Sequence, residues 1–285
     1  MYKRYVLEID DFEYLIENFK GDELEYASKE VEQRGHVLEL VNGKISASEI
    51  SAKLLNNSCK PHFFLSHSSQ DKELVTKFAN YLYETFEIKS FIDSQLWGNI
   101  REATTEYLEK YCRGDGDYYF LDPALRAINN TDSILSSALL EAMDQSDCII
   151  FVKSNNSAEL NFEFNKIPES EVKYNQYTLS PWIAIEIRYA NFLRVKRHEE
   201  IYSEISMESA SFTSKSVKNS IEPPHFEHSL DLRDYRVIPL EAVEIASEAI
   251  KERSTYDPRL YTPVGFNVDI LYATIDKFDT IKNIN

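Results

Sequence analysis

The sequence has few cysteines and no long apolar run, and each shortage excludes a class of protein. Its three cysteines, Cys59, Cys112 and Cys148, stand at unrelated spacings and form neither a disulfide framework nor a metal motif. No apolar stretch approaches the length of a membrane-spanning helix, and residues 1–11 contain no signal-peptide core. These absences predict a reduced, cytoplasmic protein that does not enter a membrane.

Basic side chains are also scarce relative to acidic ones. The chain has 31 Lys and Arg residues against 48 Asp and Glu residues, which gives a net charge of −17. This balance argues against nucleic-acid binding, which needs phosphate neutralisation, and against docking on an anionic membrane surface. An anionic small molecule remains a possible ligand because a pocket can be locally positive on an acidic protein.

The glycine-rich motifs of nucleotide cofactor sites are missing as well. There is no Gly-x-Gly-x-x-Gly and no Gly-x-x-x-x-Gly-Lys loop. The run Gly114-Asp-Gly-Asp117 lacks the later ligands of a calcium loop and is typical of a turn. We therefore expect neither a metal nor a resident cofactor.

From residue 61 onward, short apolar strands alternate with amphipathic helices. This alternation predicts an α/β fold, with a parallel sheet that carries helices on both faces. The expected strands are 62–66, 88–92, 147–152 and 236–240, and the expected helices are 71–86, 133–145, 181–194 and 241–253.

The remaining segments divide the 285 residues into a main domain and additions. Residues 1–60 are expected to form a small, mostly helical N-terminal extension. Its role would be regulation, oligomerisation or packing onto the main domain. The main domain is expected at 61–255 and the C-terminal tail at 256–285. Three insertions interrupt the main domain, at 99–132, 154–179 and 199–235.

The segment that begins at Ser180 carries the strongest chemical signal. Ser180 is a predicted helix N-cap and Pro181 the first helical residue. Trp182 and Glu186 are four residues apart and share one helix face. A carboxylate beside apolar and aromatic side chains is partly desolvated, which raises its pKa and makes it a candidate for catalysis. The alternative is an ordinary helix-face glutamate beside a core tryptophan.

Four segments together resemble a Toll/interleukin-1 receptor (TIR) domain. In chain order they resemble its first strand and loop, its second strand and following loop, its third strand, and the helix that carries the catalytic glutamate of NAD-cleaving members. The segments are Phe64-Leu-Ser-His-Ser-Ser-Gln-Asp-Lys72, Ser90-Phe-Ile-Asp-Ser-Gln-Leu-Trp-Gly98, Ser146-Asp-Cys-Ile-Ile-Phe-Val-Lys-Ser154 and Ser180-Pro-Trp-Ile-Ala-Ile-Glu-Ile187.

The resemblance covers residues 61–194, is looser at 236–253, and is absent from the first sixty and last thirty residues. It implies a flavodoxin-like doubly wound sheet. Without a receptor-type membrane span, the chain looks more like bacterial TIR effectors, including those of antiphage systems such as Thoeris.

The same resemblance implies cleavage of NAD+, as a substrate, between ribose and nicotinamide. Nicotinamide leaves as a neutral molecule, so one carboxylate that stabilises the ribosyl cation can suffice, as in glycoside hydrolysis. Glu186 is the expected catalytic residue, ionised and therefore only partly buried. The product would be ADP-ribose or a cyclic or modified ADP-ribose signal, read by a downstream effector. A homo-oligomer is expected, because active TIR sites complete themselves by self-association.

Other residues are expected to contact the substrate. Ser66 and His67 end the first strand of the resemblance, Ser154 ends the third, and Trp182 would pack on the ribose or hold Glu186. Asp93 and Trp97 fall on the expected gating loop, where Trp97 would stack on a base or anchor the loop. For His67, a hydrogen bond within its own loop is an equal alternative.

Two other functions fit the same pattern. One is a non-catalytic TIR scaffold that acts by homotypic assembly. The other is a hydrolase similar to nucleoside deoxyribosyltransferases, which share the fold and use a glutamate on a nucleoside bond.

Overall fold

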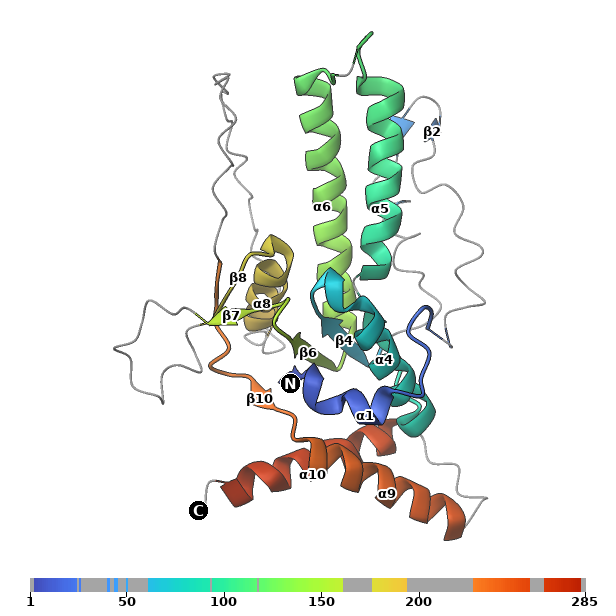
Figure 1. The fold of residues 1–285 in the computed structure, drawn as a ribbon, viewed down its shortest axis with the longest axis vertical. Coiled ribbons are helices and arrows are strands. Elements are labelled where there is room, and N and C mark those ends of the chain that lie inside the picture. Colours follow the sequence, from blue (N-terminus) through green and yellow to red (C-terminus); the bar gives the residue numbers. More distant parts are fainter. Residues whose placement is uncertain are drawn as a thin grey trace, which may run out of the picture.

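A five-stranded parallel sheet lies at the centre of the computed structural model (Figure 1). The structure describes residues 3–24, 26, 40–41, 44–45, 50, 61–92, 94–116, 118–160, 176–193, 228–256 and 264–282. The strand order is β10 (Arg236–Val237), β1 (Lys3–Glu8), β6 (Cys148–Lys153), β4 (Phe63–Ser66) and β5 (Ser90–Ile92), with every neighbouring pair parallel. The predicted α/β class with a parallel sheet is confirmed, and the arrangement is compatible with a flavodoxin-like fold.

Helices pack against both faces of this sheet. Side chains alternate along each strand, so Tyr5 and Leu7 of β1 enter one apolar core while Val6 enters the other. The first core also contains side chains of α1, α4, α9 and α10, and the second contains side chains of α6 and α8. The α-helices are α1 (Glu13–Ile16), α4 (Lys72–Phe86), α5 (Ser94–Tyr107), α6 (Leu121–Gln145), α8 (Pro181–Leu193), α9 (Leu240–Tyr256) and α10 (Val264–Lys282). The short 3₁₀ helices are η1 (Ile9–Phe12) and η2 (Ser69–Asp71), and η3 (Leu108–Cys112) is a π-helix.

The first strand corrects the expected division of the chain. Residues 1–60 were expected to form an extension, yet β1 lies inside the sheet and pairs with β6 along its whole length, from Lys3 to Glu8. Lys153 Nζ lies 2.6 Å from Glu8 Oε1 where these two strands end. Only three apolar residues stand between charged ones in β1, which is too short a run to predict a buried strand from pattern alone.

The C-terminal segment is likewise part of the main body. Residues 256–285 were expected to be a tail, but α10 places Val268, Leu271 and Ile275 in the first core. Lys3 Nζ of β1 also lies 3.2 Å from Asp276 Oδ2 of α10. The two ends of the described chain, β1 and α10, are therefore in contact, and α10 packs on the face of the sheet that carries the first core.

The expected insertion at 99–132 is largely helical. Helix α5 follows β5 after a single residue, and α6 begins at Leu121, well before the predicted start at 133. The two helices form a long hairpin that projects beyond the sheet (Figure 1). Ile100 and Ala103 of α5 are buried, as are Ala124 and Thr131 of α6, so the hairpin has its own packed seam.

A small antiparallel sheet forms beside the main one. It consists of β7 (Glu159–Leu160), β8 (Gln176–Thr178) and β9 (His228–Leu230), and it draws on two of the expected insertions. Residues 161–175 and 194–227 lie outside the described residues. Separately, β2 (Leu40–Val41) pairs with β3 (Lys44–Ile45) in an antiparallel arrangement.

Candidate active site

The candidate site lies where the direction of strand succession reverses. After β4 the chain passes through α4 to β5 on one side, and after β5 it crosses to β6 on the other side of β4. Ligands of open α/β sheets bind at the carboxyl ends of the strands beside such a switch point. Ser66 ends β4 and Ser154 directly follows β6, so both stand at this edge, as predicted.

Helix α8 delivers Glu186 to the same edge. Its start follows the prediction, because Ser180 Oγ accepts a hydrogen bond from the Ile183 N–H at 3.3 Å and Pro181 is the first helical residue. One turn later, Ser66 Oγ donates a hydrogen bond to Glu186 Oε2 at 2.5 Å. Two of the predicted site residues, from segments 120 positions apart, are thus in direct contact.

The burial of Glu186 differs from the expectation. The side chain was expected to be partly exposed, yet both Glu186 and Ser66 are 0% exposed. Ile183, Ile187 and Ala190 of the same helix are buried in the second core around it. A carboxylate removed from water is costly unless it is hydrogen-bonded, and the Ser66 hydroxyl supplies one such bond.

Trp182 lies one turn before Glu186, as predicted. It is half-buried and packs against the second core, as does Tyr189. This placement fits the role of holding the Glu186 turn in place.

Tyr235 is a neighbour of Glu186 that the sequence did not predict. Burial raises the pKa of the Tyr235 phenol, and the negative charge of Glu186 raises it further. Its hydroxyl makes no hydrogen bond to any residue that the structure describes. Tyr235 precedes β10 in a turn, and no periodic pattern marks such a residue as part of a site.

Arg4 connects β1 to α8 and to this turn. Its guanidinium lies 5.1 Å from the centroid of the Tyr235 ring, and its Nη2 lies 3.1 Å from Asp234 Oδ2. Its Nη1 contacts the Asn191 side chain near the end of α8. Since the Arg4 side chain is only 2% exposed, it holds Glu186's helix to the sheet from within the protein.

We expect Arg4→Leu to lower the free energy of unfolding by about 2 kcal/mol, because charge-assisted hydrogen bonds at a buried guanidinium are lost. Urea denaturation followed by circular dichroism measures this change. Arg233→Ala is the matched control, since its pair with Asp231 is exposed and should contribute nothing measurable. Equal destabilisation by both variants would contradict this role for Arg4.

His67 and Ser154 have structural contacts. His67 is 3% exposed, and its Nδ1 lies 3.1 Å from the carbonyl oxygen of Leu65, which belongs to the preceding strand β4 and not to the loop. Ser154 Oγ donates to Asp71 Oδ2 and accepts the N–H groups of Asn156 and Ser157 at 3.0 and 3.2 Å. These bonds order the loop after β6 and occupy the hydroxyl that was expected to meet substrate.

Asp71 is the buried acceptor that organises this loop. It is 4% exposed, and Asn156 Nδ2 donates to its second oxygen at 2.6 Å. Asp71 therefore bonds to the loop after β6, while the carboxylate in contact with Ser66 is Glu186.

The expected gating loop is largely helical where it is described. Asp93 lies outside the described residues, and Trp97 stands in the first turn of α5 rather than in a loop. Apolar residues at positions 96, 100, 103 and 107 follow helical spacing, which explains why the chain enters a helix directly after β5.

Comparison with models of known protein families, with curated proteins and with solved structures gives no match. Among the described residues, no group of three or more His, Cys, Asp or Glu side chains is placed to hold a metal ion. Within the same residues, no helix combines the length and apolarity needed to cross a membrane.

Proposed function

We propose that the chain is a TIR-type enzyme that cleaves the ribose–nicotinamide bond of NAD+, with Glu186 as its catalytic carboxylate. The observation that carries the proposal is the contact between Ser66 and Glu186 at the switch point of the sheet. It joins two of the four segments that resemble a TIR domain, at the edge where such sheets bind ligands. A role in bacterial antiphage immunity, by NAD+ depletion or by a signal to an effector, follows from the same resemblance.

The proposed reaction needs few groups. The C–N bond between ribose and nicotinamide breaks with both electrons leaving on the nicotinamide nitrogen, which becomes neutral. Positive charge develops at the ribose carbon, and the Glu186 carboxylate stabilises it. Water then adds its oxygen to that carbon and loses a proton, which gives ADP-ribose. Attack by an atom of the ADP-ribose itself gives a cyclic product.

In this scheme Ser66 is a positioning residue. Its hydroxyl fixes one carboxylate oxygen of Glu186 and so sets the direction of the other. Because Glu186 is enclosed, we infer that the reaction requires an opening of the elements around it before substrate can enter. We therefore expect weak basal activity that increases when another event favours the open state.

The α5–α6 hairpin supports self-association as that event. Seven of the large hydrophobic residues exposed in the described chain lie between positions 111 and 128: Tyr111, Tyr118, Tyr119, Phe120, Leu121, Leu125 and Ile128. Apolar patches of this kind mark interaction surfaces. We call these seven residues the hairpin tip.

One row of α6 continues from the core into the hairpin tip. Positions 121, 125, 128, 132, 135, 139 and 142 alternate steps of four and three, the spacing of a coiled-coil seam. Leu135, Leu139 and Ala142 are buried in the second core, whereas Leu121, Leu125 and Ile128 are 54%, 45% and 37% exposed. The exposed part of the row suits an α-helix as its partner.

A second copy of this chain fits that description. The same patch must be self-complementary in a two-fold dimer, and charges of both signs, Asp122 and Arg126, stand next to the exposed row in the sequence. Homotypic assembly through the hairpin tip also serves the scaffold alternative, so catalysis has to be tested separately.

A substrate panel tests the proposed reaction. Concentrated protein is incubated with NAD+, NADH and deoxyinosine, and the products are resolved by mass spectrometry. We expect nicotinamide from NAD+ alone, because dihydronicotinamide lacks the positive charge that makes nicotinamide a good leaving group. Hypoxanthine from deoxyinosine would support the deoxyribosyltransferase-like alternative instead. Release of no base from any of the three would favour the scaffold.

A further inference from the structure

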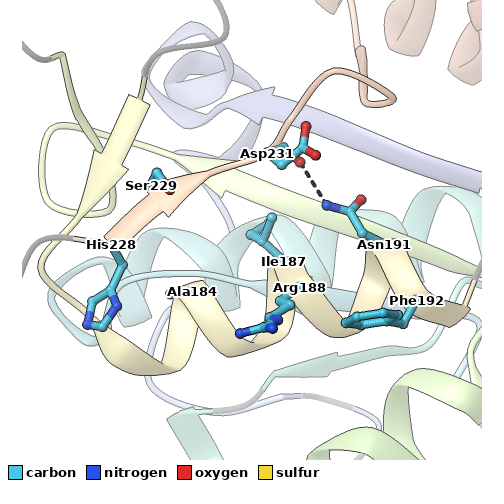
Figure 2. A pocket seen from close by; sticks show the side chains of 8 residues that line it. All are labelled: Ala184, Ile187, Arg188, Asn191, Phe192, His228, Ser229 and Asp231. Carbon is cyan, nitrogen blue, oxygen red and sulfur yellow. Dashed lines mark hydrogen bonds between the residues drawn. The ribbon is translucent and has the colours of Figure 1, made fainter.

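A pocket of about 630 Å³ lies on the side of α8 away from Ser66. Helix α8 forms one wall, and β9 with the residues that follow it forms the other (Figure 2). Neither Ser66 nor Glu186 lines it, so it is separate from the candidate active site. Its lining residues are Ala184, Ile187, Arg188, Asn191, Phe192, His228, Ser229 and Asp231.

One row of side chains gives this pocket a positive and aromatic edge. Figure 2 shows Arg188 and Phe192 in succession along α8, with His228 at the end of the row where β9 begins. The Arg188 guanidinium carbon lies 6.0 Å from the centroid of the Phe192 ring. The Phe192 side chain is 62% exposed, which is unusual for phenylalanine and leaves ring surface open to a ligand.

The acidic residue of the pocket is already neutralised. Arg233 binds both oxygens of Asp231, at 2.8 and 2.7 Å, and holds the pKa of that carboxyl below its usual value. Asn191 donates to the Asp231 main-chain oxygen at 2.9 Å, which orders the pocket wall (Figure 2). The Arg188 charge is therefore not cancelled by Asp231.

We propose that this pocket is a second nucleotide site, which takes a small nucleotide such as a nucleoside diphosphate. Arg188 is suited to phosphate, because a guanidinium forms paired charge-assisted hydrogen bonds with phosphate oxygens. Phe192 offers a flat face on which a base stacks. The Ser229 hydroxyl and the His228 imidazole lie within the same pocket, and its volume is in the range of small-molecule sites. On a chain of net charge −17, such an anion site depends on this local cation.

Isothermal titration calorimetry with ADP, adenosine and inorganic pyrophosphate tests the proposal. ADP is expected to bind at least tenfold more tightly than either part alone, because each part makes only one of the two contacts. Arg188→Gln should weaken ADP and pyrophosphate binding tenfold or more, and Phe192→Ala should weaken ADP and adenosine but not pyrophosphate. Both side chains are exposed, so the variants should fold as wild type.

The matched control is Arg126→Gln, which removes an exposed arginine from α6 and should leave ADP binding unchanged. Because Glu186 does not line the pocket, the Glu186→Gln protein should bind ADP with the wild-type affinity. The proposal is overturned if millimolar ADP produces no binding heat. It is also overturned if Arg188→Gln binds ADP as wild type does.

Discussion

Glu186→Gln is expected to reduce nicotinamide release from NAD+ by on the order of a thousandfold, because the neutral amide cannot stabilise the cation that develops on the ribose. The substitution keeps the size of the side chain and its contact with Ser66, so the core around it should remain packed. Steady-state rates, with thermal unfolding as the measure of folding, test the expectation. A folded Glu186→Gln protein that retains more than a tenth of the wild-type rate would contradict the assignment of Glu186.

Ser66→Ala extends this test to the positioning residue. Loss of one hydrogen bond to a carboxylate should lower the rate by roughly tenfold to a hundredfold. Ser90→Ala is the matched control: Ser90 is a buried serine on the neighbouring strand β5, and its hydroxyl makes no hydrogen bond to any described residue. It should leave the rate unchanged. Equal losses in the two variants would indicate a general effect on the sheet.

Leu125→Glu is expected to raise the dissociation constant for self-association by roughly a hundredfold. It places a charge in the middle of the exposed row of α6, which meets the same row of the other copy. Sedimentation velocity over a range of protein concentrations measures the change. If assembly opens the active site, NAD+ cleavage should fall in parallel while the folded monomer persists.

Two further substitutions on α6 distinguish the exposed row from the rest of the helix. Asn130→Glu adds the same charge on an exposed position outside the row and should leave association unchanged. Asp132→Asn should strengthen association, because Asp132 occupies the row and burial already raises the pKa of its carboxyl. Its ionised form therefore opposes burial, and assembly should weaken as the pH rises through that pKa. If Leu125→Glu and Asn130→Glu change the dissociation constant equally, pairing of two copies through the exposed row is contradicted.

The sheet was predictable where apolar runs are continuous. Strands β4 and β6 each bury nearly every residue, so their sequences stand out from the flanking helices. The sequence of strand β1 does not stand out in this way, because its three apolar residues lie between charged residues. Those charged residues meet their partners only in the fold, as Arg4 meets Asp234. The N-terminal half of α6 was read as part of an insertion because its apolar row is interrupted by Asp132 and exposed at its end.

The sequence predicts which residues meet at the site better than it predicts their burial and their hydrogen bonds. Helical spacing and strand order place Ser66 and Glu186 at one edge, because the carboxyl ends of parallel strands meet there. The complete burial of Glu186 depends on how tightly α8 packs on the sheet, which spacing does not express. The proximity of Tyr235 depends on a turn far along the chain. The role of Ser154 depends on Asp71, with which it pairs only in the folded structure.

The most direct test of the account is nicotinamide release from NAD+ by the wild-type protein over a wide range of protein concentrations. We expect the release of nicotinamide with an equal amount of ADP-ribose or a cyclic isomer, and a rate per molecule that rises as the protein self-associates. Intact NAD+ at concentrations where the protein is fully assembled would contradict the proposed enzyme.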